Sequence, residues 1–419
     1  MPQTRSLLLR QGRLVNNPDT VVDIAVQDGV IVGIGPSLQM AAEVVLDLDG
    51  LLISPPLVES HIHLDSVLTA GQPRWNQTGT LFEGIEIWRE RKQTLTIEDV
   101  KERAIAALKL QASQGVLYVR SHADVSEPTL TPLKALLEVR EAVKAWITLQ
   151  VVAFPQDGVY SAPGNAERLE EALKLGADAI GGIPHYELTR EDGVKSIHYI
   201  FDLAEKYDRL IDIHCDEIDD DQSRFLEVVA AEALRRDMGN RVTASHTTAF
   251  GSYNDAYAFK LMVFLQRSHI NFVSNPLINL TLQGRTDTYP KRRGLTRVKE
   301  LWQNGLNVSL GHDCIQDPWY SLGTGNLLEV AAMAVHACQM TGLEELAACY
   351  AMITTNGSRT LNVSDSYGVA VGKPANLITL DAQDAIEAIC KRATVCHVIA
   401  KGQQLVSTTP PQTTWHPML

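Results

Sequence analysis

Short apolar runs alternate with amphipathic stretches through the middle of the chain. Residues 97–114 have the pattern of a surface helix, with Thr96 as N-cap and Gly115 placed to end it, and residues 166–175 have the same pattern before Gly176. Eight such strand–helix repeats can be counted over about 310 residues, and this number predicts a closed (β/α)8 barrel, the TIM barrel of the α/β class. A doubly wound sheet is the alternative, but no G-x-G-x-x-G follows the first strand.

The two ends of the chain have a different pattern. From Ser6 to Leu48 the apolar runs are short and β-like, and Asp28-Gly29 between two of them is typical of a hairpin turn. Similar runs return after Gly372. We therefore expect residues 1–55 and 370–419 to form one small composite β-sandwich domain, with residues 56–369 as the catalytic barrel between its two parts.

Composition narrows the possible functions. The 419 residues are 45% hydrophobic and carry 37 Lys and Arg against 50 Asp and Glu, a formal charge of -13. This is typical of a globular protein, and the acidic balance disfavours a nucleic-acid polymer as partner. The six cysteines contain no C-x-x-C pair, and we see neither a signal peptide nor an apolar run long enough to span a bilayer. We expect a cytoplasmic protein without a membrane partner that binds a small molecule.

Polar residues able to bind metals or transfer protons end nearly every apolar run of the predicted barrel. They are His61 and His63, His122 and Asp124, Gln156, His185, His214 with Glu217, His246, Asn275, and Asp313. In a (β/α)8 barrel the carboxyl ends of the strands build the active site, so side chains far apart in sequence meet there. This pattern is the strongest functional signal in the chain.

A metal site is the first chemistry that these residues suggest. His61 and His63 are two residues apart in an extended segment, so their side chains point to the same face. His-x-His alone is weak evidence, but His214, His246 and Asp313 end the predicted strands five, six and eight. Imidazoles with a carboxylate suit Zn²⁺ or Fe²⁺ better than Ca²⁺ or Mg²⁺. Such an ion lowers the pKa of a bound water and supplies hydroxide near neutral pH.

Longer motifs around these residues resemble a known family. The segments HIHLDSVLTAGQPRWNQTGTLFEGIEIW, FPQDG, HCDEIDDDQSRF, TASHTTAFGSYN, NPLINLTLQGRTDTYPKRRG and GHDCIQDPWYSLGTGN are similar to the bacterial cytosine deaminases of the amidohydrolase superfamily. The similarity extends over about the whole chain. It implies one Zn or Fe(II) ion per subunit with His61, His63, His214 and Asp313 as ligands, and a homo-oligomer that acts on a free nucleobase.

The resemblance also implies catalytic roles. Deaminating a cytosine ring requires metal-bound hydroxide to attack C4 and protons to reach N3 and the departing ammonia. Glu217 matches the family's proton carrier. His246, beside the metal-bound water, and Asp313 would hold and polarise that water. His122 and Asp124 have no role in this pattern and are expected to support the site or the fold.

The base itself would be read by four residues of the family pattern. Gln156 resembles the amide that binds the O2 and N1 side of the ring, since an amide offers both a donor and an acceptor. The main-chain carbonyl of Leu81 would receive a ring N–H. Phe154 and Trp319 would pack on the flat base.

Cys314 departs from the family pattern. Cytosine-specific members have a second aspartate at this place, facing the C5 region of the ring, whereas cysteine is smaller and usually uncharged. The hypothesis is that the protein accepts 5-methylcytosine and converts it into thymine. The alternatives are a neutral replacement in a plain cytosine deaminase, a deaminase for isoguanine or another heterocycle, and, in a different class, a catalytically decayed barrel that only binds a metal or a base.

Overall fold

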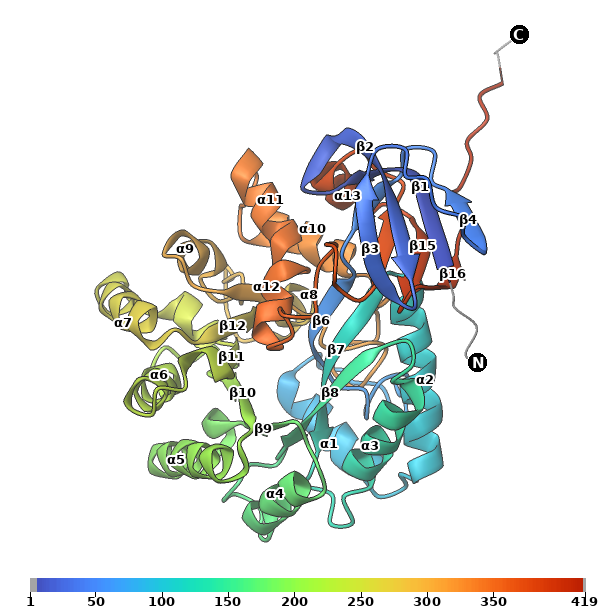
Figure 1. The fold of residues 1–419 in the computed structure, drawn as a ribbon. Coiled ribbons are helices and arrows are strands. Elements are labelled where there is room, and N and C mark those ends of the chain that lie inside the picture. The colour runs from blue at the N-terminus through green and yellow to red at the C-terminus, as the bar shows by residue number, and fades with distance from the viewer. Residues whose placement is uncertain (1–5, 417–419) are drawn as a thin grey trace.

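The computed structural model describes residues 6–416, and its larger unit is a barrel of eight parallel strands (Figure 1). Each strand pairs with the next one along the chain, and an isolated bridge between Ile62 and Asp313 joins the last strand to the first. The prediction of a closed (β/α)8 barrel is confirmed. Its strands are β6 (Leu57–Ile62), β7 (Val116–Asp124), β8 (Thr148–Phe154), β9 (Ala179–Gly182), β10 (Leu210–Cys215), β11 (Val242–His246), β12 (Asn271–Ser274) and β13 (Val308–Leu310).

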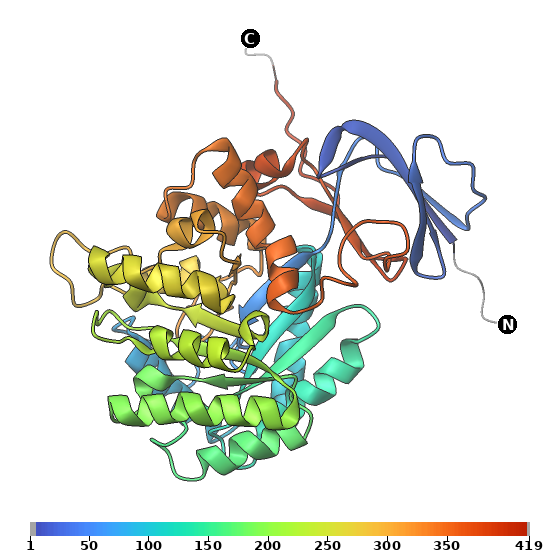
Figure 2. The ribbon, with the colours of Figure 1, turned by 60° about the vertical axis from the view of Figure 1, so that its left-hand side comes forward.

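Helices surround the barrel on the outside (Figures 1 and 2). The helix predicted over residues 97–114 is α2, and Thr96 caps it by accepting a hydrogen bond from the Asp99 backbone N–H at 3.1 Å. The helices are α1 (Leu81–Lys92), α2 (Ile97–Ser113), α3 (Thr131–Val143), α4 (Asn165–Lys174), α5 (Arg190–Tyr207), α6 (Phe225–Arg235), α7 (Asp255–Ser268), α8 (Pro276–Leu282), α9 (Val298–Gln303), α10 (Leu327–Ala337), α11 (Leu343–Met352), α12 (Thr355–Thr360) and α13 (Ala385–Lys391). One short 3₁₀ turn follows β9, a second precedes β11 and a third follows β11.

The smaller unit is a β domain built from both ends of the chain, as predicted (Figure 2). The predicted hairpin joins β2 to β3, with Asp28 and Gly29 at positive φ in its turn. The strand order is β16-β15-β14-β5-β1-β2-β3, with β4 paired to β1. The bounds are β1 (Ser6–Leu14), β2 (Asn17–Gln27), β3 (Val30–Gly35), β4 (Val44–Asp47), β5 (Leu52–Ser54), β14 (Leu377–Leu380), β15 (Val395–Ala400) and β16 (Gln403–Ser407).

The two units share apolar side chains. One small buried cluster, which includes Leu9, Ile24 and Ile399, belongs to the β domain alone. Ile378 and Val395 of the same domain lie instead in the large cluster that fills the barrel and its helix layer. Burial of this shared surface fixes the β domain against the barrel. The domain boundaries near residues 55 and 370 stay a prediction. Within residues 6–416, no helix combines the length and the apolar character needed to cross a membrane.

Candidate active site

Three strand ends carry non-glycine residues in the left-handed region of φ. Asp216 follows β10 with φ 52°, His246 ends β11 with φ 67°, and Asp313 lies beyond β13 with φ 69°. This conformation is uncommon for residues with a Cβ, and such residues cluster at functional sites. The turns occur where the strands reach the mouth of the barrel, at the edge where the sequence predicts the site.

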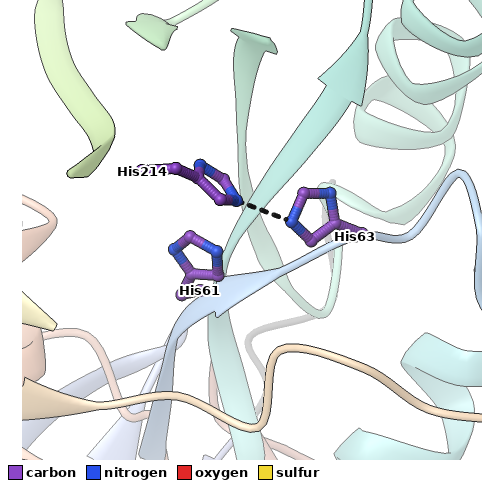
Figure 3. A group of neighbouring side chains, drawn as sticks. All are labelled: His61, His63 and His214. Atoms are coloured by element: carbon purple, nitrogen blue, oxygen red, sulfur yellow. Dashed lines mark hydrogen bonds between the residues drawn. The ribbon is translucent and has the colours of Figure 1, made fainter. Parts of the chain in front are cut away.

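The predicted metal ligands meet at this mouth. Figure 3 shows His61 and His63 on one segment, with His214 facing them from another strand. The Nε2 atoms of His63 and His214 are 3.1 Å apart. The Oδ1 atom of Asp313 lies 3.7 Å from Nε2 of His61 and 3.6 Å from Nε2 of His63. All four side chains are buried. Donor atoms of His61, His63 and His214 lie within 4.8 Å of one another, and those of His61, His246 and Asp313 do so as well, so two groups that could hold an ion share His61.

The chemistry of these donors fits a divalent transition-metal ion. Burial, followed by the neighbouring histidines, lowers the pKa of His61, His63 and His214 well below the ordinary value. The imidazoles are therefore neutral and keep a lone pair for a metal. Nε2 of His61 is buried and has no hydrogen-bond partner among the described residues, which a bound ion would satisfy. Three imidazole nitrogens and one carboxylate form a borderline-soft donor set.

A chain of buried polar groups orients His61 from behind. Its Nδ1 atom lies 3.1 Å from the Ser245 hydroxyl, which in turn donates to the Asp212 carboxylate at 2.6 Å. Arg120 donates to the other oxygen of Asp212 at 3.0 Å. Because Nδ1 is engaged, Nε2 is the ring nitrogen that faces the other ligands. The ring of His122 lies 4.1 Å from that of His61 and packs against it, a supporting position.

Glu217 lies beside the ligands and is held by two groups. Its Oε1 atom is 3.1 Å from Nδ1 of His246 and accepts a hydrogen bond from Asn279 at 3.2 Å. Burial raises the pKa of Glu217, and burial followed by the Glu217 charge raises that of Asp313. Nε2 of His246 lies 3.8 Å from Oδ2 of Asp313. The site thus contains a carboxyl group able to hold or release a proton next to the predicted ligands.

A cavity opens over these groups at the mouth of the barrel. Predicted ligands and acid–base groups form part of its lining, and aliphatic side chains form much of the rest. The lining residues are His63, Leu81, Gln156, Ile183, His214, Glu217, His246, Ile278, Leu282, Asp313, Cys314 and Trp319. The structure therefore brings Leu81, Gln156, Cys314 and Trp319 together around one space, as the sequence predicts.

Phe154 packs against one of the predicted metal ligands. The side chain is fully buried, and its ring stacks on that of His214 with centroids 4.1 Å apart and planes 21° apart. Gln156, two residues later, lines the cavity, whereas Phe154 is not part of the lining. Phe154 ends β8 with its side chain among the histidines, so it supports a predicted ligand. That it also packs on the base stays a prediction.

The segment after Asp313 places Cys314 and Trp319 in the cavity wall. Asp317 holds this segment, because its Oδ1 atom accepts hydrogen bonds at 3.0 Å from the backbone N–H groups of Trp319 and Tyr320. Trp319 also lies directly against α1 at Gly84, where a Cβ atom would overlap the indole. The glycine is thus required for close approach of the indole to the helix.

Pattern reasoning missed several residues that hold the site. Asn279 contacts both Glu217 and His246, and its only sequence signal is the pair Asn275 and Asn279, one helical turn apart in NPLIN. Ser245 lies directly before His246 but bonds to His61, which comes from another strand. These contacts join residues that are far apart in sequence, so only the fold reveals them.

The fold and its mouth together define a metal-dependent hydrolase of the barrel type. The donors lie at the carboxyl ends of the strands, where such barrels carry their chemistry, with a proton-transferring carboxyl group beside them. The model of the amidohydrolase family matches residues 44–406, so the chain belongs to the amidohydrolase family.

Individual relatives agree with this membership. A solved 5-methylcytosine deaminase from Klebsiella pneumoniae, liganded with 5-fluorocytosine, is 46% identical; the match covers 97% of this chain and 99% of that chain, with a TM-score of 0.95. N-isopropylammelide isopropyl amidohydrolase from Pseudomonas sp. (strain ADP) is 28% identical over 97% of this chain and 98% of its own length. Pterin deaminase from Rhizobium rhizogenes is also 28% identical, over 93% of this chain and 88% of its own.

Proposed function

We propose that this protein deaminates free 5-methylcytosine to thymine, with release of ammonia, and also accepts cytosine. It is a metal-dependent hydrolytic deaminase of the amidohydrolase family. The proposal is carried by Cys314, which lines a small cavity beside Asp313 in a chain that is 46% identical to a 5-methylcytosine deaminase. Self-association and a cytoplasmic location stay predictions.

The proposed ligands of the metal are His61, His63, His214 and Asp313. A divalent ion held there supplies a hydroxide nucleophile near neutral pH. Zn²⁺ and Fe²⁺ both suit three imidazoles and one carboxylate, and availability decides between them. His246 lies near the same space, but its Nδ1 atom is turned toward Glu217 and Asn279, which supports a role in holding water.

Glu217 is the proposed proton carrier. Hydrolysis replaces the C4 amino group by oxygen, so a proton from water must reach ring N3 and another must reach the departing nitrogen. Glu217 is the carboxyl group of the cavity placed to make both transfers, since Asn279 and His246 fix its Oε1 atom. His246 and Asp313 would hold the attacking water through hydrogen bonds aimed at the charge that develops on it.

Recognition of the base follows from the cavity wall. Gln156 offers an amide donor and acceptor to the O2 and N1 edge of the ring, and the Leu81 carbonyl accepts a ring N–H. The Trp319 indole covers one face of the flat base. Ile183 and Ile278 complete an apolar wall, which matches an uncharged ring.

Preference for a methylated base comes from Cys314. Its Sγ atom lies 3.7 Å from Oδ1 of Asp313, and burial raises the pKa of the thiol well above its ordinary value. The side chain is therefore an uncharged thiol. The methyl group of 5-methylcytosine can make apolar contact with the thiol. Against a carboxylate, the same methyl group would displace water from a charge, which costs free energy.

A panel of free bases tests this function. Metal-loaded protein, with Zn and Fe content measured, is incubated with 5-methylcytosine, cytosine, isoguanine and a pterin, and both ammonia and the product base are measured. We expect thymine from 5-methylcytosine at the highest kcat/KM. Preference for cytosine would favour a plain cytosine deaminase. Preference for isoguanine or the pterin would favour a deaminase for another heterocycle. Base binding without any turnover would favour a catalytically decayed barrel.

A further inference from the structure

Helix α1 lies at the end of the barrel away from the β domain (Figure 1) and contributes to the cavity at its first residue, Leu81. Its last residue, Lys92, is buried, with only 7% of the side chain exposed. A lysine is seldom buried to this extent unless it is paired. The helix therefore has one end in the candidate site and the other end fixed by a buried charge.

Two carboxylates hold that charge. Nζ of Lys92 lies 2.8 Å from Oδ2 of Asp124 and 2.8 Å from Oδ2 of Asp157. Burial lowers the pKa of Lys92, but the two carboxylates together raise it above its ordinary value. Trp88, one turn earlier on α1, donates its indole N–H to the same Asp124 oxygen at 3.0 Å. The contacts give a charge-assisted network that is largely screened from water.

These carboxylates sit at the ends of two barrel strands. Asp124 is the last residue of β7, and its backbone N–H donates to Asp65 at 2.8 Å. Asp157 directly follows Gln156, the proposed reader of the base, and its backbone N–H donates to the Ser126 hydroxyl at 2.9 Å. Lys92 thus ties α1 to the strand ends next to Gln156.

The ion pairs of Lys92 connect the segments that carry Leu81 and Gln156, and the proposed function places both of these residues on the same base. Leu81 is at the opposite end of α1 from Lys92, and Gln156 is the neighbour of Asp157. Along the same helix, Gly84 lies directly against the Trp319 indole. A shift of α1 relative to β8 would therefore move the Leu81 carbonyl and the indole away from Gln156 together.

We propose that Lys92 is a positioning residue for base recognition, which acts by pinning α1 to Asp124 and Asp157 so that Leu81, Trp319 and Gln156 face one bound base. This inference rests on the proposed function. The ion pairs of Lys92 are with Asp124 and Asp157, and Lys92 is not part of the cavity lining, so its effect belongs to binding of the base and not to the acid–base chemistry.

The test uses full-length Lys92→Met, which keeps an apolar stem but removes the charge. We expect KM for 5-methylcytosine and the inhibition constant of thymine to rise about tenfold, which corresponds to a loss of about 1.4 kcal/mol of binding free energy. We expect kcat to change by less than about threefold and metal content to stay equal to wild type. Hydrogen exchange should accelerate at the amides of residues 81–92 and not in the barrel strands.

Companion variants separate positioning from simple loss of stability. Lys92→Arg keeps the charge and should recover most of the KM. Arg89→Met is the matched control, because Arg89 lies on the same helix and bonds the other oxygen of Asp157 at 2.8 Å but is half exposed; it should leave KM unchanged. If Lys92→Met fails to fold, the triple variant with Asp124→Asn and Asp157→Asn leaves no buried charge unpaired and should show the same rise in KM.

The outcomes distinguish this inference from the function beneath it. If wild-type protein converts none of the bases, the proposed function fails. If the wild-type protein is active and Lys92→Met leaves KM unchanged, the positioning role is wrong. The same conclusion holds for the triple variant if it replaces Lys92→Met. A loss of kcat together with loss of metal, with KM unchanged, would also overturn it.

Discussion

The two sides of the cavity are built differently. On one side, which we call the metal side, His61, His63, His214 and Asp313 lie on barrel strands or within three residues of a strand end. On the other, the base side, Leu81 begins a helix and Trp319 lies in the segment that follows Asp313. The metal side is therefore positioned by sheet hydrogen bonds, whereas the base side is positioned by side-chain contacts such as that of Asp317.

This difference separates chemistry from specificity. A strand end is held by its neighbours on both sides, so a change there affects the reaction for every base. Loops and helix ends can shift with little cost to the barrel, so a change there alters which base is bound. Substitutions on the metal side should lower kcat, and those on the base side should raise KM or change the preferred base.

Removal of the metal should have the largest effect. Dialysis against a chelator should abolish deamination of every base, because the nucleophile depends on the ion. Zn²⁺ or Fe²⁺ added back separately should restore activity, and the better of the two identifies the suitable ion. Full activity in protein shown by elemental analysis to be metal-free would contradict the assignment of the metal side.

Glu217→Gln should lower kcat by about 10²- to 10⁴-fold, the usual contribution of a positioned acid–base group. The amide keeps the volume and the contact with Asn279 but cannot carry a proton. Metal content and binding of thymine serve as controls and should stay at wild-type levels. Retention of more than about a tenth of the activity would place the proton carrier elsewhere.

Ser245→Ala should weaken metal binding by about 10- to 100-fold, as loss of a group that orients a ligating histidine does. The substitution removes the hydrogen bond to Nδ1 of His61 and frees the ring to turn. Competition with a chromogenic chelator measures the affinity. Ser309→Ala is the matched control, since Ser309 is a buried serine on β13 that bonds Thr360. Equal metal affinities in the two variants would argue against a role of Ser245 in orienting His61.

Gly84→Ala tests the base side and should raise KM about tenfold with little change in kcat, because the new methyl group displaces the Trp319 indole. Alanine is the better helix former by about 1 kcal/mol, so a loss of α1 is not the expected cause. The exposed neighbour Glu86, changed to Ala, provides the control. An unchanged KM would mean that the indole does not contact the base.

The mouth of the barrel and its histidines could be predicted from the residues alone because their positions are periodic, whereas the choice of four ligands came from the family resemblance and stays a prediction. Eight apolar runs ending in polar residues imply a barrel mouth, and the structure places His61 there with His63 and His214, and also with His246 and Asp313. The helix bounds were predicted within a residue for α2 because Thr96 is a capping residue with a defined hydrogen bond. The sequence pattern is enough to predict the structure wherever strand periodicity or a helix cap determines the backbone conformation.

The base side needed the family resemblance, since nothing periodic marks it. Leu81 and Trp319 approach the cavity through contacts between segments distant in sequence, such as Gly84 against the indole. The packing of Phe154 could not be predicted for the same reason. A residue at a strand end can face the cavity or pack behind a ligand, and strand periodicity does not reveal that the Phe154 ring stacks on that of His214.

The specificity of wild type and Cys314→Asp tests the central claim most directly. The measurement is the ratio of kcat/KM for 5-methylcytosine to that for cytosine, with Cys314→Ala as a control for the loss of the thiol. We predict a ratio above one for wild type and for Cys314→Ala, and a fall of about tenfold or more in Cys314→Asp, where the methyl group meets a carboxylate. A wild-type enzyme that ignores 5-methylcytosine, or a Cys314→Asp variant that keeps the wild-type ratio, would contradict the account.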